Sequence, residues 1–166
     1  MANYFTLTLD TTGPASPSIV LNGGAQYATE QLVTAAIGTS DGSTTGYQMK
    51  IWGNVDPSHN ANIQATEGAS AWITYNTSQQ VKLSSGDGSK TIYLKIRDDV
   101  YNESSQASDT ITLDMTLPVV TVSNVSANRI SKVAGKNSIT FQLSADSIFD
   151  EYKVKVVSAS GSPHDS

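Results

Sequence analysis

The chain has 166 residues, no cysteine, 15% charged residues and a formal net charge of −5. Serine and threonine together make up 41 residues, a composition that argues against a helical bundle or a coiled coil. The missing cysteines exclude disulfides and thiolate metal sites. The acidic balance predicts no binding to nucleic acid, and no apolar run is long enough to span a membrane.

Short segments with alternating apolar and polar residues follow one another through the first two thirds of the chain. Period-two alternation is typical of strands with one buried and one solvated face. Glycine- and asparagine-rich turns, such as 22–24 and 86–88, separate the segments. We expect two antiparallel sheets packed face to face over residues 10–115, with the longest strand at 90–97. The predicted strands are 18–21, 32–37, 47–51, 71–75, 81–83, 90–97 and 110–113.

An internal repeat marks the module boundary. LTLDTTGP at 7–14 reappears as ITLDMTLP at 111–118, so that residue 7 aligns with residue 111, an offset of 104. A weaker echo relates YQMKI at 47–51 to YKVKV at 152–156. This spacing is the size of one β-sandwich domain. The repeat predicts an N-terminal strand at 1–9, a complete domain at 10–115 and a second, partial domain at 116–166.

The second domain has too few predicted strands to close a sandwich. Only 119–122, 138–143 and 152–157 read as strands, and three strands leave Ile139, Phe141 and Leu143 exposed on one side. Either another chain covers this face or the sequence stops partway through a domain, and we favour the second interpretation. We predict a subunit contact at these three residues.

The N-terminal segment 4–9 matches the closing strand before Asp114. It is either the opening strand of the first domain or a strand that adds to the sheet of a neighbouring subunit. We therefore predict inter-subunit pairing through Tyr4, Phe5, Leu7 and Leu9.

The stretch GDGSKTIYLKIRD at 86–98, followed by YNES at 101–104 and DTITLD at 109–114, resembles the immunoglobulin-like repeat of bacterial surface proteins and tailed-bacteriophage virion proteins. The resemblance covers residues 68–118 well. It implies an all-β immunoglobulin-like β-sandwich followed by a partial second immunoglobulin-like domain. Tyr101 departs from the pattern, because this family usually has glycine before the asparagine.

The resemblance specifies a fold module more strongly than a function. Residues 1–15 lack the basic start and apolar core of a secretory signal, so we expect a virion protein rather than a secreted surface protein. The expected role is a non-enzymatic structural or adhesion module of a phage tail, baseplate or head surface. Its partners would be other virion proteins, copies of itself and host-surface glycans. The alternatives are a carbohydrate-binding module and a bacterial cell-surface repeat.

Two ligand sites follow from the residue types. Trp52, Tyr75 and Tyr101 are candidates for stacking on a host glycan, with Trp72 expected in the core. Asp98, Asp99 and Asn102 are candidates for holding calcium at a strand end. The competing interpretations are packing for the rings and hydrogen bonding to turn amides for the acids. We predict no catalytic residue and no cofactor.

Overall fold

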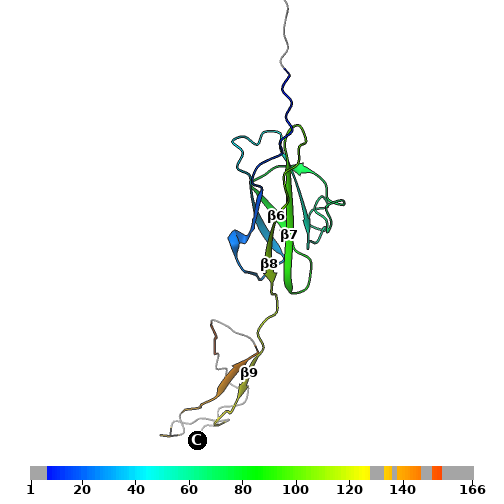
Figure 1. The fold of residues 1–166 in the computed structure, drawn as a ribbon. Coiled ribbons are helices and arrows are strands. Elements are labelled where there is room, and N and C mark those ends of the chain that lie inside the picture. The colour runs from blue at the N-terminus through cyan, green and yellow to red at the C-terminus, as the bar shows by residue number, and fades with distance from the viewer. Residues whose placement is uncertain (1–6, 128–132, 136–137, 147–150, 155–166) are drawn as a thin grey trace, which may run out of the picture. The chain divides into compact units, whose positions relative to one another are not determined.

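The computed structural model describes residues 7–127, 133–135, 138–146 and 151–154. Its contacts divide the chain into two compact units, 1–116 and 117–166 (Figure 1).

One sheet of the first unit has three antiparallel strands in the order β1 (Ser18–Leu21), β3 (Leu32–Gly38) and β6 (Ser78–Lys82). In the register, Ile19 pairs with Ile37, and Val33 pairs with Val81. These residues are buried, whereas their neighbours along each strand point to solvent. The alternation in the sequence therefore predicts which face of this sheet is covered.

The other sheet has five strands in the order β2 (Tyr27–Ala28), β8 (Ala107–Leu113), β7 (Gly88–Arg97), β4 (Gln48–Gly53) and β5 (Ile73–Thr74). Its pairings are antiparallel except that β2 runs parallel to β8. A short 3-10 turn, η1 (Asn22–Gly24), carries the chain from β1 in the first sheet towards β2 in the second. The strand β2 is not predicted from the sequence, because a strand of two residues is too short to show alternation.

The inward faces of the two sheets form one hydrophobic core. Met49 and Ile51 from β4 and Leu94 and Ile96 from β7 are fully buried there. The sheet orders β1-β3-β6 and β8-β7-β4, with β5 beside β4, are those of an immunoglobulin-like sandwich. The predicted fold class is confirmed. Over the ranges described above, no helix is long and apolar enough to cross a membrane.

The second unit contains an antiparallel strand pair, β9 (Val120–Ser123) with β10 (Gln142–Ala145). The predicted strand at 138–143 begins later than expected, and residues 151–154 are in no strand. Residues 155–157 of the third predicted strand lie outside the described residues. At the other end of the chain, residues 7–9 of the predicted N-terminal strand are in no strand. A lone segment has no neighbouring strand to satisfy its backbone groups, so alternation alone does not make it a strand.

Candidate functional site

The outward face of the five-stranded sheet carries polar and charged side chains in two adjacent rows. Gln48 on β4 is paired with Arg97 on β7, and Lys50 is paired with Lys95. All four alternate with core residues, so they project from the same outer face.

Two cations of this face stack on aromatic rings. The Lys50 Nζ lies 4.7 Å from the centroid of the Trp72 ring, and the Arg97 guanidinium lies 4.4 Å from it. The Arg97 guanidinium is also 4.5 Å from the centroid of the Tyr101 ring. Trp72 directly precedes β5, whose pairing with the start of β4 brings the indole beside these cations. We call Lys50, Trp72, Arg97 and Tyr101 the cation–aromatic cluster.

The charges on this face are not evenly compensated. Lys95 forms ion pairs with Glu67 at 2.8 Å and Glu103 at 3.3 Å. The hydrogen bond to Glu67 is the main cause that raises the pKa of Lys95 above its usual value. Arg97 donates through Nε to Gln48 Oε1 at 2.7 Å, which fixes the plane of its guanidinium. Among the described residues, neither Lys50 nor Arg97 forms an ion pair with a carboxylate.

The loop after β7 is built around Asp98. Its buried carboxylate accepts hydrogen bonds from the backbone N–H of Val100 at 3.0 Å and of Asn102 at 2.8 Å. The Asn102 side-chain amide adds a third at 3.0 Å. These bonds hold Tyr101 at a φ of +69°, a region that bulky side chains avoid. The position where the resembling family usually has glycine therefore keeps a glycine-like conformation with a tyrosine in it.

At the predicted calcium site the structure shows a hydrogen-bonded turn, and calcium binding there stays a prediction. The Asp98 carboxylate is occupied by turn amides, and the Asn102 amide nitrogen faces it. In the part of the chain that the structure describes, no group of three or more His, Cys, Asp or Glu residues is arranged to hold a metal ion. An Asp followed by a tight turn commonly caps that turn, and this is the role that the geometry supports.

The structure does not bring the predicted glycan residues together. Trp52 is only 7% exposed, because its ring stacks on Tyr93 at 5.7 Å and Gln64 pairs with it at the sheet edge. Tyr75 is half-buried against the core. Only Tyr101, at 66% exposure, presents an open ring. Trp72, which was expected in the core, instead lies half-buried beside Lys50 and Arg97.

Alternation could have placed Lys50 and Arg97 on this outer face. It could not have shown that Trp72 arrives there, because a long loop separates β4 from β5.

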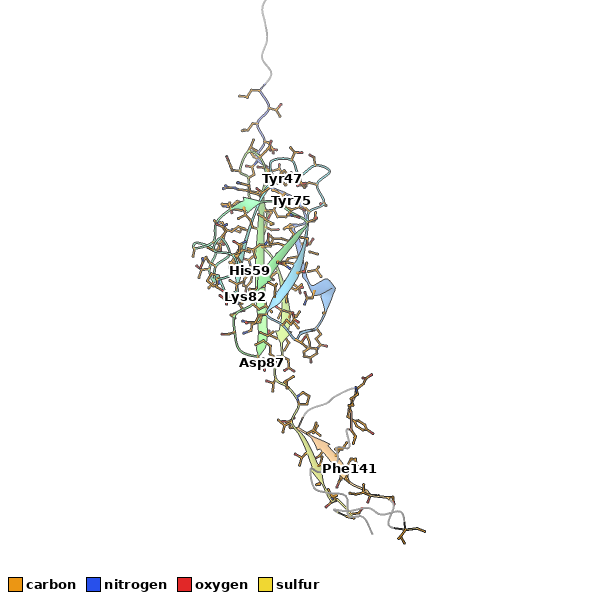
Figure 2. All side chains as sticks on the ribbon, turned by 180° about the vertical axis from the view of Figure 1, so that it is seen from behind. Tyr47, His59, Tyr75, Lys82, Asp87 and Phe141 are labelled. Carbon is orange, nitrogen blue, oxygen red and sulfur yellow. The ribbon has the colours of Figure 1, made fainter. Side chains whose placement is uncertain are left out.

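Tyr47 and Tyr75 meet edge-to-face at 6.4 Å at one end of the first unit, and Asp87 lies at the other end (Figure 2). Burial, and then the hydrogen bond from the Tyr47 hydroxyl to Asp41 Oδ2 at 3.0 Å, raise the pKa of Tyr47 to about 12. The folded state thus holds this proton more tightly than the unfolded chain, whose tyrosine pKa is about 10. This contribution to stability is complete below about pH 10 and is lost as the pH rises towards about 12.

We therefore expect the free energy of unfolding to fall between about pH 10 and about pH 12, and to fall less steeply in Tyr47→Phe. Urea titrations across this range measure the slope. Tyr27→Phe is the control, because Tyr27 is exposed. Equal slopes in Tyr47→Phe and the unsubstituted protein would contradict the assignment.

The second unit has an apolar face. A groove of about 520 Å³ is lined by side chains from 118–122, 141–143 and 151–154. Phe141 is exposed on this unit (Figure 2), as are Ile139, Val120 and Val122, and Leu143 is half-buried.

In the first unit, Leu7 and Leu9 are 96% and 84% exposed. Tyr4 and Phe5 lie outside the described residues.

No protein-family model matches the chain, and no curated protein matches it. Among solved structures, the chain is similar to a PKD domain of an M14-like peptidase from Thermoplasmatales archaeon SCGC AB-540-F20. The TM-score is 0.44 and the identity is 17%, over 63% of this chain and 98% of that one. The immunoglobulin-like fold stated above rests on the strand orders and the core.

Residues 38–42, Gly-Thr-Ser-Asp-Gly, match a motif that in hydrolases exposes a nucleophilic serine at a strand-to-helix turn. Here the segment joins β3 to β4, and no helix follows β3. The backbone N–H of Ser40 donates to Ala15 O at 3.0 Å, as in an ordinary loop. The motif therefore lacks the context that its chemistry needs.

Proposed function

We propose that the protein is a non-enzymatic structural module of an assembled particle, in the tail, baseplate or head surface of a tailed phage. The observation that carries this proposal is the exposed apolar face of the second unit. Apolar patches rimmed by polar residues are typical of protein interfaces. The sequence resemblance at 86–114 is to repeats of tailed-bacteriophage virion proteins and of bacterial surface proteins, and of these two settings we propose the phage particle.

The proposed occupant of the groove is residues 4–9 of a second copy. The sequence of this segment repeats that of the closing strand β8. The two copies of the repeat also share a local hydrogen bond. The N–H of Thr12 donates to Asp10 Oδ1 at 3.0 Å, and the N–H of Thr116 donates to Asp114 Oδ1 at 3.2 Å. Segments 4–9 and 108–113 thus precede the same turn.

The two copies of the repeat differ in how far their apolar side chains are buried. Ile111 and Leu113 of β8 are buried, whereas the equivalent Leu7 and Leu9 are exposed. A strand that carries the closing-strand pattern with an uncovered apolar face is suited to add to an incomplete sheet.

The first unit indicates where such a strand would dock. Leu21 of β1 donates its N–H to Asp109 Oδ2 of β8 at 2.7 Å, so these two strands are neighbours across the sandwich. The β9–β10 pair repeats the antiparallel β1–β3 pair, which makes β9 the counterpart of β1. We therefore place Leu7 and Leu9 against Val120 and Val122, which line the groove.

Disulfide trapping tests this contact, because the chain has no cysteine of its own. Leu7→Cys protein mixed with Val122→Cys protein is expected to form a mixed disulfide under mild oxidation, detected by mass spectrometry without reductant. Thr8→Cys is the matched control, since its side chain lies on the opposite side of an extended segment. The contact is refuted if Thr8→Cys couples to Val122→Cys as efficiently as Leu7→Cys does.

Location is tested separately. The chain is expected to copurify with intact phage particles at a fixed ratio to the major particle protein, as measured by quantitative mass spectrometry. Recovery in the cell-envelope fraction of uninfected cells would instead support the bacterial-surface alternative.

A further inference from the structure

We propose that the cation–aromatic cluster of the first unit binds a carboxylate-bearing saccharide. This site lies on the outer face of the five-stranded sheet, and the proposal is independent of the assembly contact of the second unit. It combines the two contacts that an acidic sugar needs, a ring to lie on its apolar face and a cation for its carboxylate.

The charges on this face leave two cations available. Glu67 and Glu103 both form ion pairs with Lys95, and in the described part of the chain neither carboxylate lies within ion-pair distance of Lys50 or Arg97. Asp98 is buried and turned to backbone amides. Two like charges beside one indole repel each other, and an anion between them removes that cost.

Arg97 is held ready for a planar anion. Its guanidinium lies within 4.5 Å of the ring centroids of both Trp72 and Tyr101, and its Nε is fixed by Gln48. A guanidinium fixed in this way loses little rotamer freedom when it forms paired hydrogen bonds to a carboxylate. Pre-organisation of this kind lowers the free-energy cost of binding.

Tyr101 supplies the second observation. It holds a φ of +69° at 66% exposure, although glycine adopts this conformation without strain. Its ring is not needed for packing of the core. The hydrogen bonds of the turn are made by backbone groups and by the Asp98 carboxylate, not by the ring. A strained, exposed aromatic residue beside cations that have no carboxylate partner is the arrangement expected where a ligand uses the ring. Its open face is suited to stack on a pyranose.

The test is an array of oligosaccharides that carry uronic or sialic acid, each beside a neutral partner that lacks only the acidic sugar, followed by calorimetry on the best pair. We expect binding to the acidic member and at least tenfold weaker binding to the neutral one. Arg97→Lys keeps the positive charge but loses the planar guanidinium that can form paired hydrogen bonds to a carboxylate. It is expected to weaken binding at least tenfold. Equal binding to both members, or binding to neither throughout the array, would overturn the proposal.

Tyr101→Gly separates a ligand role from a structural one. It relieves the backbone strain, so the midpoint of thermal unfolding should stay the same or rise while acidic-saccharide binding falls at least tenfold. Tyr27→Ala removes another exposed ring, on β2, and should leave binding unchanged. A Tyr101→Gly protein that binds normally would refute the role of the ring. Binding of a single-stranded oligonucleotide to this face in place of the saccharides would refute the ligand class.

Discussion

Replacement of Gly53 by alanine is expected to lower the free energy of unfolding of the first unit by about 2–4 kcal/mol, measured by urea denaturation. Gly53 ends β4 at a φ of +132°, which L side chains rarely adopt. A Cβ there would also overlap the backbone carbonyl oxygen of Thr91 on the neighbouring strand β7. The backbone of a central strand cannot yield without breaking the β4–β7 register.

Substitutions at two other glycines distinguish the cost of the positive φ from the cost of the clash with Thr91. Gly86 has a φ of +81° but nothing within 4 Å of its added Cβ. Gly86→Ala should therefore lower the free energy of unfolding only by the cost of holding alanine at a positive φ, about 1–2 kcal/mol. Gly42 has neither a positive φ nor a neighbour within 4 Å, and Gly42→Ala should be neutral or slightly stabilising. If Gly53→Ala proves no more harmful than Gly86→Ala, close packing against Thr91 is not the cause.

Asp98→Ala is expected to be the most harmful substitution in the loop after β7, at about 2–4 kcal/mol. It removes the acceptor of the Val100 and Asn102 backbone N–H groups together. Asp98→Asn keeps a carbonyl oxygen in the same place and should recover about half of the loss. Chemical denaturation of the three proteins gives these differences directly.

The same measurement distinguishes a turn cap from a metal ligand. Calcium or a chelator should leave the unfolding midpoint of the unsubstituted protein unchanged. A midpoint that rises with calcium in the unsubstituted protein but not in Asp98→Asn would instead support the calcium prediction.

Much of the first unit follows from the chain's local pattern. Ile92, Leu94 and Ile96 alternate with Tyr93, Lys95 and Arg97, and because strand side chains alternate between faces this pattern predicts the buried side of β7 without any knowledge of its neighbours. The same reasoning places Lys50 and Arg97 on the outer face. The repeat of Leu7 to Pro14 at Ile111 to Pro118 likewise predicts the module length.

What the pattern could not predict depends on loops that cross between strands. Periodicity puts Trp52 on the solvent side of β4, but Gln64 returns to pair with it and Tyr93 stacks on it, so the ring is buried. Trp72 reads as a core residue, yet the pairing of β5 with β4 brings it to Lys50 and Arg97.

The acidic turn at Asp98 illustrates the same limit. The residue types there are compatible with both a calcium ligand and a turn cap, and the hydrogen bonds that Asp98 accepts from backbone N–H groups favour the cap. Alternation within a strand is a local property that the sequence determines by itself. The assembly of the cation–aromatic cluster from three separate segments is a consequence of long-range closure, which only the tertiary structure decides.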